Sequence, residues 1–356
     1  MLANRPLNLF VLLVCSVILN GGRLLAQVPA GPAPFALPPA IISPNDTPYP
    51  GVIRLSVDAT DTDRHIFSVR ETVPVRDGTS TVLLYPQWLP GNHSPSGRID
   101  SLGGLTIRAN GTRVEWTRDP VNVFAFHLAA PAGATELTLE FEFLSPVDTG
   151  EGRTVVTPEM LNLQWNAVVL YPAGYFTRQI QVEPSVRLPQ GWQFATALEV
   201  ASTNGGVTAF KPVSLETLVD SPMFAGRFFK NVDLDAGGPA PVHLNIVADR
   251  PGLLEIKSEQ LAAHRALVQQ AYKLYGSHHY DHYDFLLALT DRMGGIGLEH
   301  HQSSENATVP GYFTEWDKNA DSRDLLPHEY THSWNGKFRR PADLWTANFN
   351  VPMRDS

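Results

Sequence analysis

A change in hydrophobic period near residue 250 is the feature that most limits how this chain can fold. Over residues 51–247 short runs alternate apolar and polar side chains, and glycine, proline, asparagine and aspartate separate the runs. Such alternation is typical of strands with one face in a core, and the β-branched and aromatic residues in the runs favour strands. Residues 253–275 instead place apolar side chains at helical spacing, and Gly276 closes the segment. The sequence therefore predicts an N-terminal antiparallel β domain, a sandwich or saddle, followed by an α+β domain.

Three further segments are expected in the second domain. DFLLALTD at 284–291 predicts a strand, and GGIGLEHHQSS at 294–304 is rich in glycine. A helix is expected to begin at or close to Pro327, because proline is tolerated in a first helical turn but not in a helix interior. The expected organisation is a signal peptide at 1–26, a proline-rich lead-in at 27–50, the β domain at 51–248 and the second domain at 249–356.

The first residues resemble a secretory signal peptide. Arg5 supplies positive charge, Leu9 to Leu19 is largely apolar, and Ala26 is a small residue at a plausible cleavage point. The alternative, a membrane anchor, is disfavoured because the apolar run is too short to span a bilayer. We therefore expect an exported protein, periplasmic or extracellular, with no stable membrane anchor after the signal is cleaved.

Cysteine content and charge exclude several kinds of site and partner. Cys15 is the only cysteine and lies within the signal segment, so the mature chain has no disulfide and no thiolate ligand. A metal site must then be built from histidine and carboxylate side chains. The formal net charge is −9, and no basic stripe stands out, which argues against nucleic acid as a partner.

His328, Glu329 and His332 form the pattern His-Glu-x-x-His. Two histidines four residues apart lie on one face of a helix, so both imidazoles can reach one metal ion. Neutral imidazole suits Zn²⁺, and the glutamate beside the first histidine is placed to take a proton from water at the metal. The pattern predicts a zinc peptidase with His328 and His332 as ligands and Glu329 as the general base. The alternative is an ordinary helix whose histidines cap or pack.

The sequence around this motif resembles a known signature. HEYTHSWNGKFRRP at 328–341 is similar to the pattern His-Glu-x-x-His-x-Trp-Asn-x-Lys, followed closely by Arg-Pro, of the glycyl aminopeptidase family of zinc peptidases. Phe338 departs from the pattern, since many relatives carry a basic residue at that position. Beyond the motif itself, the matching residues are Trp334, Asn335, Lys337, Arg340 and Pro341.

The resemblance implies a gluzincin, with an N-terminal β domain, a thermolysin-like catalytic domain and usually a PDZ domain behind it. NVPMRDS at 350–356 is similar to the family's approach to its next helix. The family's third zinc ligand, a glutamate, would then lie beyond Ser356. We therefore expect a C-terminally truncated chain that holds only the first part of the thermolysin-like domain.

A second candidate element is Gly-Leu-Glu-His at 297–300. It resembles the glycyl aminopeptidase version of the G-x-x-E element of zinc aminopeptidases. The resemblance implies an edge strand, with Gly297, whose backbone pairs with an extended peptide, and a carboxylate, Glu299, that binds the free α-amine of the substrate. The alternative is a strand-edge turn, where glycine lets the backbone bend. We expect His300 and His301 to shape this turn rather than to bind the metal.

Three other segments carry clustered polar or aromatic side chains. The histidine-rich run at 278–282 could suggest a second metal site, but compositional histidine tracts carry little weight, and a structural role is expected. The segments 85–97 and 163–176 are rich in aromatic residues and glycine. We expect turns of the β domain with packed aromatics there, rather than a substrate lining.

The predicted function is the removal of small N-terminal residues, with glycine preferred, from peptides that have a free N-terminus. Zinc would activate water, and Glu329 would act as general base. Two alternatives stay open. A zinc endopeptidase would also cleave internal bonds of blocked peptides, and a truncated, catalytically inactive fragment or relative would lack the third zinc ligand.

Overall fold

The computed structural model describes residue 31 and residues 36–76, 80–148 and 150–354, so the predicted signal peptide lies outside the described residues. The chain divides into two units, Met1–Pro39 and Ala40–Ser356, and every helix and strand below belongs to the second unit. In the part of the chain that the structure describes, no helix is both long and apolar enough to cross a membrane.

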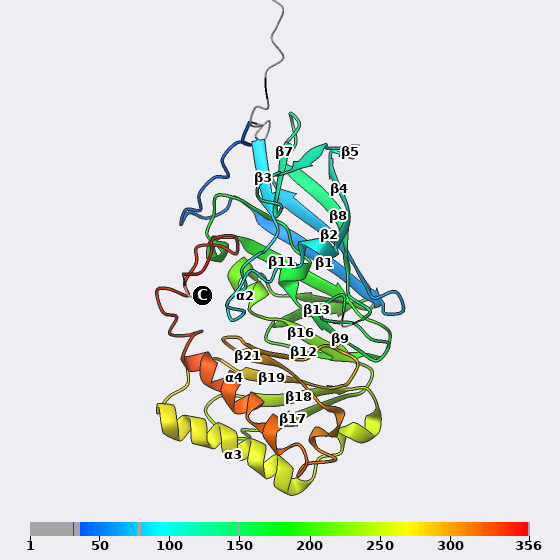
Figure 1. Ribbon diagram of the computed structural model, residues 1–356, viewed down its shortest axis with the longest axis vertical. Helices are drawn as coiled ribbons and strands as arrows, with labels where there is room; N and C mark the ends of the chain where they lie inside the picture. The colour runs from blue at the N-terminus through cyan, green and yellow to red at the C-terminus, as the bar shows by residue number, and fades with distance from the viewer. Residues whose placement is uncertain (1–30, 32–35, 77–79, 149, 355–356) are drawn as a thin grey trace, which may run out of the picture. The chain divides into compact units, whose positions relative to one another are not determined.

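A nine-stranded sheet forms most of the N-terminal part, in the order β13-β14-β11-β1-β2-β8-β4-β5, with β15 paired to β11 (Figure 1). Buried and exposed side chains alternate along β1 and β2, as the sequence pattern predicted. All pairs are antiparallel except β1 with β11. The strands are β1 Val52–Asp61, β2 Ile66–Pro74, β4 Leu102–Ala109, β5 Thr112–Arg113, β8 Glu136–Leu144, β11 Gln181–Arg187, β13 Val200–Asn204, β14 Val207–Phe210 and β15 Val213–Ser214.

Two smaller sheets and one short helix complete this part. One sheet has the order β10-β3-β7-β6 and the other the order β12-β16-β9. Ser214 caps the helix α2, Leu215–Val219, because its side chain accepts a hydrogen bond from the backbone of Thr217. The strands are β3 Ser80–Leu84, β6 Trp116–Arg118, β7 Ala125–Ala129, β9 Met160–Leu163, β10 Tyr171–Pro172, β12 Gln193–Thr196 and β16 Met223–Gly226.

The C-terminal part is a five-stranded mixed sheet, in the order β17-β18-β19-β21-β20, with the helices α3 and α4. β20 lies at the edge and pairs only with β21, in antiparallel fashion. Together with the N-terminal sheets, this arrangement confirms the predicted α+β class. The elements are β17 Phe229–Asp233, β18 Val242–Ala248, α3 Ser258–Tyr275, β19 Tyr283–Leu289, β20 Ile296–Glu299, β21 Ser303–Thr308 and α4 Leu325–Trp334.

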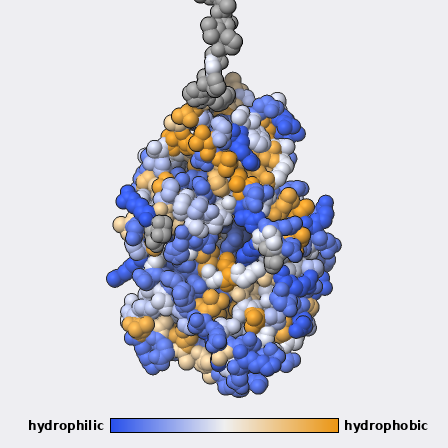
Figure 2. Space-filling model, viewed as in Figure 1, coloured by the Kyte–Doolittle hydropathy of each residue, from blue (hydrophilic) through white to orange (hydrophobic). Residues whose placement is uncertain are grey.

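Side chains from both faces of the five-stranded sheet are buried, which explains why every residue of β19 is buried. On one face, Phe285 of β19 packs with Val268 of α3 and Tyr330 of α4. On the other face, Leu286 packs with Phe224 of β16, so the N-terminal strands cover that side. Figure 1 shows the same order of layers, and Figure 2 shows a largely hydrophilic surface around α3 and α4.

Two expected boundaries differ from the structure. The five-stranded sheet begins at Phe229, whereas the expected domain boundary was 248/249. An alternating strand has the same pattern in either sheet, so periodicity could not show which sheet takes β17 and β18. The helix expected over 253–275 begins only at Ser258, after a 3₁₀ turn at Pro251–Leu254. The apolar side chains before Ser258 pack into the same core as α3 without being part of an α-helix, which extended the apparent period.

Candidate metal and peptide site

The helix α4 brings His328 and His332 to one point. Their Nε2 atoms lie 3.2 Å apart, and their ring centroids are 4.8 Å apart. Pro327 is the third residue of α4, so its missing N–H falls in the first turn, where helical donors have no intrahelical partner anyway. Within the described residues, one group of three potential ligands has its donor atoms within 4.8 Å of one another: His328, Glu329 and His332.

A backbone contact fixes the tautomer of His332. Its Nδ1 lies 3.1 Å from the backbone oxygen of Asn335. A carbonyl oxygen only accepts, so Nδ1 carries the proton and the neutral ring keeps a lone pair on Nε2. A backbone carbonyl in this position is a usual partner of a metal-binding histidine.

Glu329 is buried beside this pair, with 4% of its surface exposed. Burial raises the pKa of its carboxyl to about 7, and the charge of Glu299 acts in the same direction while His332 opposes it. Gly297 of β20 lies against this carboxylate. A β-carbon at position 297 would lie 2.5 Å from Oε1 of Glu329 and 2.6 Å from Cδ1 of Leu325. The glycine is therefore needed because strand and helix approach closely here.

Glu299 ends β20 and is 9% exposed. Its carboxylate makes no hydrogen bond or ion pair with any residue that the structure describes, although a buried charge without a partner is costly. Gly91 covers it from the N-terminal β domain. The segment 85–97, expected only to form a turn, thus reaches a candidate site residue. Nothing in the sequence links Gly91 to Glu299, because the contact joins distant parts of the chain.

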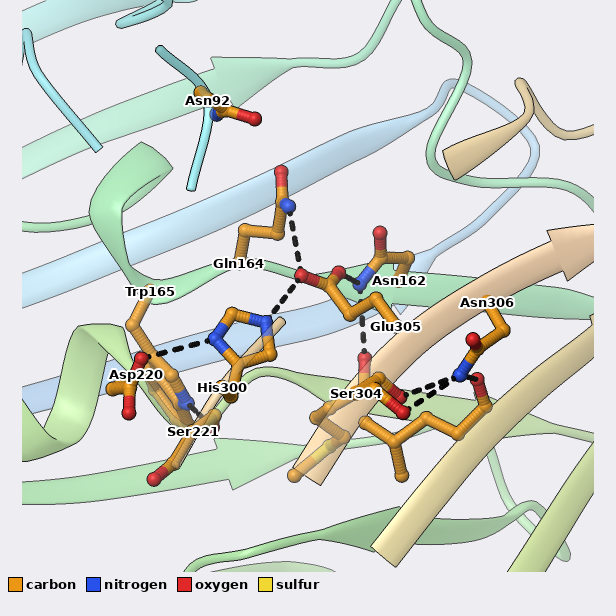
Figure 3. Close-up of polar contacts among 12 residues, drawn as sticks. Asn92, Asn162, Gln164, Trp165, Asp220, Ser221, His300, Ser304, Glu305 and Asn306 are labelled. Carbon is orange, nitrogen blue, oxygen red and sulfur yellow. Dashed lines mark hydrogen bonds and ion pairs between the residues drawn. The ribbon is translucent and has the colours of Figure 1, made fainter. Parts of the chain in front are cut away.

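His300, the next residue, lies between two carboxylates (Figure 3). Its Nδ1 is 3.2 Å from Oδ1 of Asp220, and its Nε2 is 2.9 Å from Oε2 of Glu305. Burial alone would lower the pKa of His300, but its hydrogen bonds to Asp220 and Glu305 outweigh burial and raise it to about 9. Both ring nitrogens are occupied, so His300 has no free atom with which to bind a metal ion.

The carboxylates around His300 have further partners. Glu305 accepts hydrogen bonds from Nδ2 of Asn162 at 2.7 Å and from Nε2 of Gln164 at 3.1 Å. Nζ of Lys337 lies 2.6 Å from Oδ1 of Asp220. Burial would raise the pKa of Asp220, but Lys337 and His300 hold it well below its usual range. Two cations and two carboxylates therefore compensate one another between the N-terminal part and the five-stranded sheet. Sequence reasoning did not identify Asp220 or Glu305.

The histidine-rich run at 278–282 pairs within the protein. Nδ1 of His279 lies 2.9 Å from Nε2 of His301, and the two rings stack. The ring of Phe338 stacks on His279 at 4.4 Å between centroids. His282 pairs with Asp284 at 2.8 Å. These contacts fit the structural role that we expected for the run.

A His-Glu-x-x-His helix packed against the edge strand of a mixed sheet defines the zinc metallopeptidase class of site. Two family models match the chain: the Peptidase M61 N-terminal domain over residues 54–227, and the M61 glycyl aminopeptidase domain over residues 321–356. Together they match more than half of its 356 residues. The chain belongs to the M61 glycyl aminopeptidase family.

The chain is also similar to solved structures. The chain is similar to the crystal structure of an aminopeptidase N family protein from Idiomarina loihiensis, with a TM-score of 0.69 and 19% identity over 85% of this chain and 51% of that chain. This chain therefore spans about half the length of that relative. An M1 zinc metallopeptidase from Deinococcus radiodurans also matches, with a TM-score of 0.46 and 15% identity over 86% of this chain and 68% of that chain. A search of curated proteins found no match.

Proposed function

We propose that this chain belongs to a zinc-dependent aminopeptidase that removes small N-terminal residues, with glycine preferred, from peptides. His328 and His332 are the proposed zinc ligands. Nitrogens about 2.0–2.1 Å from one tetrahedral ion lie about 3.3 Å apart, and the two Nε2 atoms are 3.2 Å apart. Catalytic zinc sites use three protein ligands and an open position, so a further ligand completes the proposed site.

Zinc, when bound in such a site, activates water and polarises the carbonyl group that is attacked. Glu329 is the proposed general base, because it is the carboxylate beside the ligand pair. It takes a proton from the attacking water and later delivers it to the leaving amine. The Glu329 carboxylate occupies space that a side chain at position 297 would otherwise fill, so Gly297 makes its position possible.

The observation that favours an aminopeptidase over an endopeptidase is that the buried Glu299 carboxylate lacks a partner among the described residues. It is nearly buried, negatively charged when ionised, and has no partner among the described residues, while Glu329 adds a second carboxylate nearby. A substrate's α-ammonium group would supply the missing positive charge. The edge strand β20 offers free backbone groups beside it for an extended peptide.

The first test combines metal analysis with two substrates. In a protein that contains the further ligand, we expect one zinc per chain and cleavage of a glycine arylamide, but poor cleavage of its N-acetylated form. Glu329→Gln should keep the zinc and lose about 10²- to 10⁴-fold in rate. Glu299→Gln should keep the zinc and lose the preference for the free amine. Glu315→Gln, at an exposed glutamate, is the control and should change neither property.

Three results would contradict the proposal. The first is full activity of Glu329→Gln, and the second is equal cleavage of free and acetylated substrates by the unmodified chain. The third is a protein that contains the further ligand and neither holds zinc nor cleaves. The same result for residues 27–356 alone would instead support the inactive-fragment alternative. Export remains part of the proposal, and N-terminal sequencing of the secreted protein would test removal of residues 1–26.

A further inference from the structure

The loop of residues 89–93, from the N-terminal β domain, lies directly on the strand that carries Glu299. Gly91 has a φ of +95°, and a β-carbon there would lie 2.8 Å from Oε2 of Glu299 and 2.8 Å from Cδ1 of Leu298. The loop therefore covers the Glu299 carboxylate and the Leu298 side chain together, and only glycine fits at this contact.

Behind this contact is a cavity of about 290 Å³. Leu89, Pro90 and Leu298 are among the residues that line the cavity, and Glu299 is not. Leu89 and Leu298 are 5% and 3% exposed. These apolar side chains therefore separate the Glu299 carboxylate from the cavity.

Most of the other side chains that line the cavity are polar, and several of them form ion pairs. The Lys337 side chain is 2% exposed and is paired with Asp220. Arg340 pairs with Glu216 at 3.3 Å, and His300 and Glu305 also line the space. Figure 3 shows how His300 and Glu305 are fixed by partners on several elements. A cavity with such walls does not collapse easily, and it suits a polar side chain rather than an aliphatic one.

The loop is fixed on its other side as well. The backbone N–H groups of Gln87 and Trp88 donate to the backbone oxygen of Phe349, at 3.0 and 2.7 Å. Within the loop region, Nδ2 of Asn92 donates to Oγ of Ser96 at 2.8 Å. Phe349 itself lines the cavity. The position of the loop is thus set by residues beyond the zinc-motif helix, as well as by its own domain.

We propose that the 89–93 loop and Leu298 form a wall that keeps the first side chain of the substrate out of this cavity. The inference rests on the proposed function, in which Glu299 binds the α-amine. The first side chain branches from the carbon that carries that amine, so it must lie next to the wall. A small residue needs no space beyond the wall, whereas a longer one would need the cavity.

The test opens the wall and measures binding by calorimetry, using amino acid amides with the zinc-loaded full chain. Leu298→Ala and Leu89→Ala each remove part of the wall. The affinity for glutaminamide should rise about 10-fold or more relative to that for glycinamide, because the atoms removed from the leucine leave room for the longer side chain. Leu128→Ala is the control, because Leu128 is also 5% exposed and lies in β7 of the same domain. It should leave the affinity ratio unchanged.

A second pair of variants tests the contact by narrowing it. Gly91→Ala should weaken glycinamide binding at least about 10-fold, because its β-carbon displaces the Glu299 carboxylate. Gly191→Ala carries the same backbone strain, with φ of +81°, but no atom lies within 4 Å of its β-carbon. It should bind glycinamide like the unmodified chain.

The outcomes separate the wall from the proposed function. If glycinamide binds and N-acetylglycinamide does not, but all wall variants keep the original affinity ratio and Gly91→Ala equals Gly191→Ala, the wall is overturned while the amine site stands. If the unmodified chain binds both amides equally or neither of them, the amine site fails and the wall fails with it.

Discussion

The charge on His300 makes the stability of the protein depend on pH, and His300→Gln should remove that dependence. The pKa of His300 rises on folding to about 9, from about 6.5 in an unfolded chain. A group whose pKa rises on folding contributes its full stabilisation below the unfolded pKa and loses it as pH rises to the folded pKa. The free energy of unfolding should therefore fall between pH 6.5 and 9.

The size of this fall follows from the shift. One pKa unit corresponds to about 1.4 kcal/mol, so a rise to about 9 corresponds to about 3 kcal/mol. His300 is 4% exposed, so solvent screens this interaction little. The free energy of unfolding of the unmodified chain exceeds that of His300→Gln by an amount that should be about 3 kcal/mol smaller at pH 9.5 than at pH 6.5.

Urea titrations followed by tryptophan fluorescence measure this difference at both pH values. His264→Gln is the matched control, because His264 is also buried but lies in α3, where it contacts Gln260 and Tyr312. Burial lowers the pKa of His264, so it is neutral across this range and the variant should follow the unmodified chain. The argument is refuted if His300→Gln loses as much stability between pH 6.5 and 9.5 as the unmodified chain does.

Three further predictions concern the site and the core. Gly297→Ala should lower the rate of glycine arylamide cleavage about 10²-fold by displacing Glu329, whereas Gly295→Ala, with no atom within 4 Å of its β-carbon, should not. Zinc at about 100 times its Kd should raise the free energy of unfolding by about 2.7 kcal/mol, and a thermal melt of His328→Ala should show no such rise. Glu71→Gln should raise the free energy of unfolding at pH 8, measured in urea. Burial raises the pKa of Glu71 well above its usual range, so its ionisation opposes folding as pH rises.

Local patterns predicted the elements better than their partners. β19 and α3 lie close to the segments that periodicity assigned, and β1 alternates as expected. The sequence could not show which sheet β17 and β18 join, because strand pairing is a long-range property that does not affect the period of one strand.

The sequence by itself determined that His328 and His332 lie together, because a spacing of four residues on a helix fixes their common side locally, and that Glu329 lies beside them. Only the tertiary structure decided what surrounds them. Gly91 reaches Glu299, and Asn162 reaches Glu305 across 143 residues of chain. Such contacts depend on how whole sheets pack, and each residue type involved also occurs in ordinary turns and strands. A short segment therefore determines the chemistry of the zinc motif. The surroundings proposed to select a substrate form only when the N-terminal sheets pack on the five-stranded sheet.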